Sequence, residues 1–217
     1  LAAGLRRIDG RIVGDASAFD DEELGAGWAW DDMAFDYSAP VSALQFNEDI
    51  ARLVVRPGPG EGSPATIELT PAESGLVVDN RVTTGPGDRV ALSLRRLPGS
   101  ERLTVSGSIG QLAKESARLV AVDSPSAYFA RALRRVLVER GIEVTGPAVD
   151  VRALDVKPVL DPVEPFFVHH SPPLSDAARV LMKVSQNLYA ETFLKTIGAV
   201  AGEGGNAESG RKEVARV

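Results

Sequence analysis

The sequence has no cysteine and only two histidines among its 217 residues. The absence of cysteine excludes disulfide bonds, thiolate zinc sites and a cysteine nucleophile. Two histidines argue against a multi-histidine metal site. No apolar run approaches the roughly 20 residues that a membrane-spanning helix needs. The chemistry of this chain must therefore rest on hydroxyl, amide, carboxylate and amine groups.

Positive charge is also scarce, because 24 basic residues face 30 acidic ones and the net charge is -6. Binding to a nucleic-acid backbone needs clustered positive charge, so we expect no nucleic-acid partner. Hydrophobic residues make up 44% of the chain and charged residues 25%, which is typical of a folded globular chain. Peripheral association with a membrane and the oligomeric state stay open.

The pattern of apolar residues predicts an α+β fold. Short β segments separated by Gly- and Pro-containing turns recur between residues 65 and 122 and indicate a small antiparallel β domain. A helix is predicted to follow Ser124, a candidate N-cap with Pro125 at the first helical position, and to end at Gly141. Two further helices are predicted at about 174–184 and 186–200.

The triplet Ser185-Gln186-Asn187 lies between these last two predicted helices. A Ser-x-Asn triplet is weak evidence by itself. In the ordinary interpretation Ser185 caps the following helix and Asn187 lies in its first turn.

The surroundings of the triplet resemble the class C penicillin-binding proteins, a family of D-Ala-D-Ala carboxypeptidases and endopeptidases. The resemblance extends over two sets of blocks in the same order and with similar spacing. The blocks are 14–19, 27–33 and 38–44, followed by 171–175, 182–193 and 197–198.

The resemblance implies inserted β-rich accessory domains, followed by the helical start of a β-lactamase/transpeptidase-like domain. We predict four segments: a first part of an accessory domain, an inserted small antiparallel β domain, a second part of the accessory domain and a partial transpeptidase-like region with Ser-x-Asn. Their bounds are 1–56, 57–115, 116–165 and 166–217.

The family's chemistry uses three motifs: Ser-x-x-Lys, Ser-x-Asn and Lys-Thr-Gly. By resemblance, Ser185 is a proton relay to the leaving amine and Asn187 anchors the substrate's peptide carbonyl. The first motif is expected before Leu1 and the third after Val217, so the chain alone should lack the nucleophile and be inactive. The stretch 195–198 mimics the third motif but has an extra isoleucine and lies on a predicted helix; Lys183 is treated as structural.

A loop rich in aromatic and acidic residues contains Trp28, Trp30, Asp31 and Asp32. By resemblance it binds the amino-bearing side chain of the substrate, because acidic groups attract a cation and an aromatic ring offers it a face. In the alternative interpretation the tryptophans form a hydrophobic plug between domains and the aspartates are solvated.

The resemblance therefore implies a serine-type DD-peptidase that cleaves peptidoglycan stem peptides through an acyl-enzyme and is acylated by β-lactams. It implies no cofactor and no metal, and a location on the cell-wall side of the membrane, periplasmic or extracellular. The alternative is a non-catalytic cell-wall-binding or interaction module with a vestigial Ser-x-Asn.

Two other clusters carry little chemistry. His169 and His170 are adjacent, and neighbouring strand residues point to opposite faces, so we expect a surface pair. The run 20–23 is acidic but has no Gly-containing calcium loop around it, which favours a solvated turn.

Overall fold

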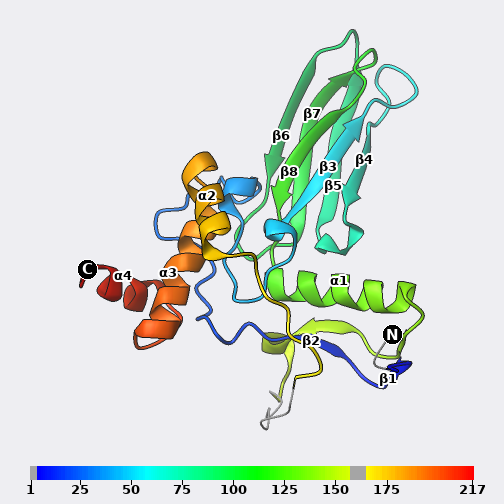
Figure 1. The fold of residues 1–217 in the computed structure, drawn as a ribbon. Helices are drawn as coiled ribbons and strands as arrows, with labels where there is room; N and C mark the ends of the chain where they lie inside the picture. Colours follow the sequence, from blue (N-terminus) through cyan, green and yellow to red (C-terminus); the bar gives the residue numbers. More distant parts are fainter. Residues whose placement is uncertain (1–3, 157–164) are drawn as a thin grey trace.

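The computed structural model describes residues 4–156 and 165–217 (Figure 1). Its fold is α+β, as predicted. The strands are β1 (Arg7–Ile8), β2 (Ile12–Gly14), β3 (Ile50–Arg56), β4 (Thr66–Thr70), β5 (Val77–Gly85), β6 (Val90–Arg95), β7 (Arg102–Gly110), β8 (Ser116–Ala121), β9 (Glu143–Val144) and β10 (Ala148–Asp150). The α-helices are α1 (Pro125–Glu139), α2 (Leu174–Val184), α3 (Asn187–Ala201) and α4 (Ala207–Val214).

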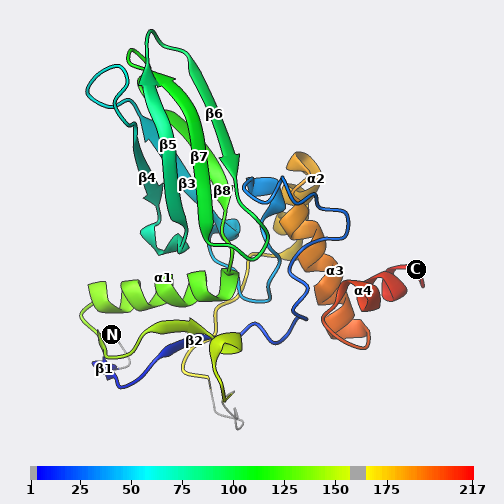
Figure 2. The same ribbon diagram turned by 180° about the vertical axis from the view of Figure 1, so that it is seen from behind.

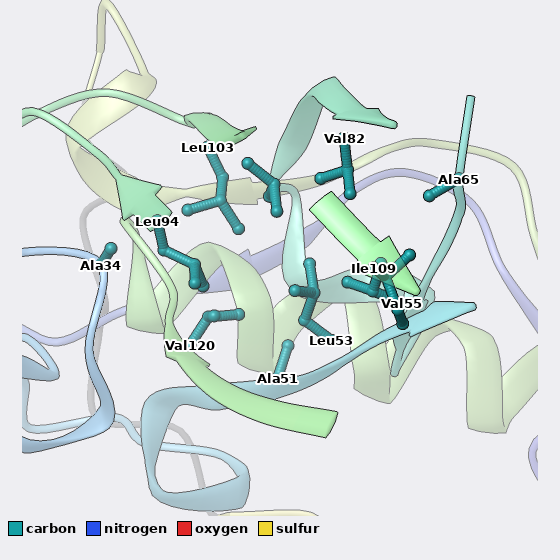
Figure 3. Packing of buried hydrophobic residues seen from close by; sticks show 11 residues of the cluster. Ala34, Ala51, Leu53, Val55, Ala65, Val82, Leu94, Leu103, Ile109 and Val120 are labelled. Carbon is teal, nitrogen blue, oxygen red and sulfur yellow. The ribbon is translucent and has the colours of Figure 1, made fainter. Parts of the chain in front are cut away.

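Two three-stranded sheets, ordered β4-β3-β8 and β5-β7-β6, form a β unit with one hydrophobic core. Figure 3 shows side chains from both sheets meeting in that core. The core residues are Ala34, Ala51, Leu53, Val55, Ala65, Val82, Leu94, Leu103, Val105, Ile109 and Val120. This burial of apolar surface holds the two sheets together.

The alternation of apolar residues explains which face of β7 enters the core. Leu103, Val105 and Ile109 occupy alternate positions and are fully buried. Gly107 lies between them at a φ of +116°, and an added Cβ would come 2.0 Å from the carbonyl oxygen of Ala91 on β6. A side chain at this position would push the neighbouring strand away, so glycine is required there.

The β unit differs from the predicted antiparallel insert in two respects. β5 pairs with β7 in parallel, whereas the other pairings in the unit are antiparallel. β3 and β8 lie outside the predicted segment 57–115, although β8 is within the predicted run of β segments between residues 65 and 122. The two strands pair with each other, and β3 pairs with β4. As a division into domains, the four predicted segments stay predictions, and residues 1–3 and 157–164 lie outside the described residues.

Helix α1 lies between the β unit and a lower layer formed by β1, β2, β9 and β10 (Figure 2). The predicted helix start is confirmed, with Ser124 at the N-cap and Pro125 at the first position. Tyr128 is fully buried, donates to the carbonyl oxygen of Ile50 at 3.1 Å and meets the Phe46 ring edge to face. These contacts fix α1 to the base of β3.

Helices α2, α3 and α4 gather beside the β unit (Figure 1). The two predicted helices are confirmed within one residue at each end. The short apolar run Phe166–Val168 predicts a strand by its composition, but it forms none: its three side chains are exposed. Helix α3 also contacts the short 3-10 helix Asp36–Ser38, which brings the aromatic loop to the Ser-x-Asn triplet.

Candidate active site

The Ser-x-Asn triplet forms the sharp junction between α2 and α3. Ser185 ends α2 in the left-handed region, with φ 56° and ψ 46°. Gln186 is the N-cap of α3 and its side chain makes no capping bond, while Asn187 is the first helical residue. Asn187 thus lies in the first turn as expected, but the ordinary interpretation of Ser185 as the cap of the following helix is wrong.

The left-handed backbone of Ser185 is unusual for a residue other than glycine. Such a conformation costs of order 1–3 kcal/mol and persists where the surroundings enforce it, often at functional sites. The Ser185 side chain is exposed, and its hydroxyl makes no hydrogen bond within the described part of the chain. The hydroxyl is therefore presented to solvent and can exchange a proton with a neighbouring group.

Asn187 is half-buried and has a fixed side chain. Its Nδ2 donates to the backbone carbonyl oxygen of Tyr37 at 2.9 Å. An amide nitrogen has two N–H donors, so one remains for another acceptor. This contact joins α3 to a residue 150 positions away in the chain.

Tyr37 continues this connection into the aromatic and acidic loop. Its ring stacks on Phe35 with centroids 5.5 Å apart, and its hydroxyl donates to Oδ1 of Asp32 at 2.8 Å. Partial burial and the bond to Asp32 raise the pKa of Tyr37, so the phenol stays a donor. The chain Asn187–Tyr37–Asp32 is the part of the predicted site that the fold brings together.

The other predicted loop residues lie around this connection without bonding to the triplet. Trp30 is 56% exposed, and the guanidinium of Arg95 lies 5.4 Å from the centre of its ring. Asp31 is exposed. The plug interpretation does not describe Trp30, because more than half of its surface is open to solvent and a cation from β6 covers one face.

Trp28 lies near α3, although the two are far apart in the sequence. It is half-buried beside Gly25, where an added Cβ would come 2.6 Å from the indole Nε1 and 3.0 Å from Oε1 of Glu191. Glu191 is four residues after Asn187 and shares its side of the helix. Trp28 therefore lies near the side of α3 that carries Glu191 and Asn187.

Comparisons with known proteins show the family to which the chain belongs. The sequence model of the D-Ala-D-Ala carboxypeptidase 3 (S13) family matches residues 1–217. The chain belongs to this family. The resemblance to penicillin-binding D-Ala-D-Ala carboxypeptidases is confirmed.

Individual relatives give the extent of the similarity. A D-alanyl-D-alanine carboxypeptidase of Actinomadura sp. is 32% identical over 96% of the chain, and the D-alanyl-D-alanine carboxypeptidase DacB of Haemophilus influenzae is 26% identical over 89%. These matches span 39% and 40% of the relatives' own lengths. The crystal structure of penicillin-binding protein 4 (dacB) from Haemophilus influenzae superposes with a TM-score of 0.74 at 22% identity, over 99% of this chain and 47% of that one.

The stretch Lys195–Gly198 is not the third family motif. It lies in α3, and Lys195 is 3% exposed with its Nζ 2.5 Å from both Oδ1 of Asp20 and the carbonyl oxygen of Glu22. The ammonium is therefore used to attach the 20–22 segment to α3. A substrate carboxylate could not reach it without breaking this pair.

One Ser-x-x-Lys spacing occurs within the chain, at Ser209 and Lys212, although the first motif is expected before Leu1. Ser209 is 5% exposed in α4, and its hydroxyl accepts from the backbone N–H of Glu203 at 2.8 Å. Lys212 pairs instead with Glu208 at 2.9 Å. The serine is buried and has no base beside it, so this pair is structural.

The described residues contain no group of three or more His, Cys, Asp or Glu side chains suited to a metal ion. His169 and His170 are exposed, as expected of a surface pair.

The acidic run 20–23 is only partly solvated, because Asp20 pairs with Lys195 and Glu23 pairs with Arg152 at 2.7 Å. Among the described residues, no helix has the length and apolar character to cross a bilayer.

Glu48 also contacts the triplet, and sequence reasoning did not identify it. Its Oε2 accepts from Nε2 of Gln186 at 3.3 Å, and its Oε1 accepts from the hydroxyl of Tyr189 at 3.1 Å. Glu48 lies just before β3, about 140 residues away from its partners. No local pattern in the sequence indicates such a contact.

Proposed function

We propose that the protein carrying this chain is a serine-type D-Ala-D-Ala carboxypeptidase or endopeptidase that cleaves peptidoglycan stem peptides and binds penicillin. Membership of the S13 family and the names of two relatives support the reaction class. The observation that carries the proposal is the junction of α2 and α3. There the Ser185 hydroxyl has no hydrogen-bond partner among the described residues, and the Asn187 amide, two residues on, uses one of its two N–H donors.

In the proposed reaction a serine from the Ser-x-x-Lys motif, placed before Leu1, attacks the D-Ala-D-Ala carbonyl. Asn187 uses its remaining N–H to hold the substrate's peptide carbonyl, and Ser185 passes a proton to the leaving amine. The acyl-enzyme is then hydrolysed by water. A β-lactam acylates the same nucleophile but is released slowly.

The loop beside the triplet would receive the side chain of the stem peptide. Asp32 is fixed by Tyr37, whereas Asp31 and the exposed part of Trp30 face solvent. An ammonium group on the substrate would therefore meet carboxylates and an aromatic ring within one loop. Trp28 would close this region against α3. Such a substrate places the enzyme on the cell-wall side of the membrane, in the periplasm or outside the cell.

The experiment is labelling of the family-length protein with a fluorescent penicillin, together with the coding sequence on both sides of the chain. We expect Ser-x-x-Lys upstream, Lys-Thr-Gly downstream and covalent labelling. Ser185→Ala should slow acylation by roughly 10²–10⁴, the range for loss of an acid–base group. An unchanged rate would remove Ser185 from the mechanism.

The alternative is a non-catalytic wall-binding or interaction module in which Ser-x-Asn is vestigial. The observation that favours it is that the strands of the β unit, β3 to β8, contain neither Ser185 nor Asn187. Loss of the flanking motifs and absence of labelling would support this alternative.

A further inference from the structure

The turn that precedes β3 has a constrained backbone. Asn47, Glu48 and Asp49 all have positive φ values, at 54°, 53° and 54°. Three consecutive non-glycine residues in the left-handed region are costly, so the turn must be enforced by its surroundings. Glu48, the central residue, projects its carboxylate to α3.

Hydrogen bonds within the turn enforce this conformation. The Asp49 N–H donates to the carbonyl oxygen of Phe46 at 3.0 Å, and Oδ1 of Asp49 accepts from the Phe46 N–H at 3.1 Å. Nδ2 of Asn47 donates to the carbonyl oxygen of Ile50 at 2.8 Å. The turn is thus closed on both sides of Glu48.

The turn is also attached to the core of the molecule. Asp49 is fully buried, and its carbonyl oxygen accepts from the N–H of Val122 at 2.9 Å. Phe46 packs against Tyr128 of α1 with ring centroids 5.0 Å apart. Glu48 is therefore the exposed tip of a rigid segment and not part of a free loop.

The carboxylate of Glu48 contacts α3 on both sides of Asn187. One oxygen accepts from Gln186, immediately before it, and the other accepts from Tyr189, two residues after it. Asn187 itself bonds to Tyr37. The first turn of α3 is thus held by two separate segments, while the Ser185 hydroxyl makes no bond within the described residues.

We propose that Glu48 is a positioning residue for the Ser-x-Asn motif. It holds Gln186 and Tyr189, and through them sets the place of Ser185 and Asn187. The inference rests on the proposed function, because the contact is expected to change the rate of the acylation step. A displacement of about 1 Å in a catalytic group can cost on the order of 10²-fold in rate.

The first test measures β-lactam acylation of the family-length protein. Glu48→Ala should lower the acylation rate constant about 10- to 100-fold, with the noncovalent affinity and the melting temperature close to wild type. Glu48→Gln keeps one oxygen acceptor and should give an intermediate rate. Glu61→Ala, an exposed glutamate in the 57–62 turn, is the matched control and should match wild type.

A second arm separates positioning from general destabilisation. On a background that carries both Ser185→Ala and Asn187→Ala, Glu48→Ala should cause no further loss, because its effect passes through these two residues. Additive losses, a wild-type rate in Glu48→Ala, or a fall in melting temperature that accounts for the lost rate would each overturn the inference. If wild type and Glu61→Ala are not labelled at all, the proposed function has failed and the inference fails with it.

A third measurement uses the 217-residue chain and needs no activity. In a ¹H–¹⁵N spectrum, Glu48→Ala should shift the Asn187 side-chain NH₂ and the 186–190 amides, while signals of the β unit stay in place. An unchanged Asn187 signal would overturn the positioning role even where acylation is slowed.

Discussion

Replacing Ser185 by glycine should separate stability from activity. Glycine reaches φ 56° without a Cβ penalty, whereas serine in this region costs about 1–3 kcal/mol. The gain is offset by the greater freedom of glycine in the unfolded chain, about 0.5–1 kcal/mol. Because the Ser185 hydroxyl makes no bond within the described residues, nothing else is lost. We expect a net stabilisation of about 1 kcal/mol.

The assay is thermal and denaturant unfolding of the 217-residue chain. A gain of about 1 kcal/mol corresponds to a rise in melting temperature of roughly 2–4 °C for a chain of this size. Ser185→Ala keeps the Cβ and should melt near wild type, which makes it the matched control. In the family-length protein both variants should acylate slowly. A Ser185→Gly variant that melts below Ser185→Ala would refute the assignment of backbone strain to this junction.

Three further predictions concern buried charge and the nucleophile. Burial raises the pKa of Asp49 well above its ordinary value, with Glu23 adding to the effect, and Oδ2 of Asp49 has no hydrogen-bond partner among the described residues. The protonated form therefore stabilises the fold fully below the unfolded pKa of about 3.9, and this contribution is lost as pH rises through the folded pKa. Asp49→Asn should gain in melting temperature over wild type as pH rises towards neutrality; a difference independent of pH would contradict this. Asp20→Ala leaves the Lys195 ammonium buried with only the Glu22 carbonyl, and should cost about 3 kcal/mol in denaturant unfolding. Lys195→Met should cost less, and the reverse order would show that the pair is not the stabilising element. The 217-residue chain alone should not be labelled by a fluorescent penicillin, and a labelled Ser209 in a peptide map would show that the chemistry has been misplaced.

Much of the local structure follows from the sequence because its causes are local. Ser124 and Pro125 mark the start of α1, and apolar spacing predicts α2 and α3 closely. Short β segments between Gly- and Pro-containing turns predict the strands from β4 to β8. They do not predict the parallel pairing of β5 with β7, because that pairing joins segments that are not adjacent in the chain. The composition of Phe166–Val168 predicts a strand, but this segment has no partner strand among the described residues.

The candidate site was predictable in its residue types and not in its connections. Ser185, Asn187 and the Trp28–Asp32 loop come from the resemblance, but Tyr37 as the link between Asn187 and Asp32 appears only in three dimensions. Glu48 is a polar residue in a short turn, and only the left-handed backbone of that turn directs it to α3. The conformation of Ser185 likewise depends on how α2 and α3 pack.

The role of Ser185 and Asn187 is tested most directly by a crystal structure of the family-length protein acylated by a β-lactam. We expect Nδ2 of Asn187 to lie about 3 Å from an amide carbonyl oxygen of the bound ligand, and the Ser185 hydroxyl to lie within hydrogen-bond reach of the acylated serine. An acyl group that lies away from the α2–α3 junction, with Asn187 still bonded only to Tyr37, would contradict this role.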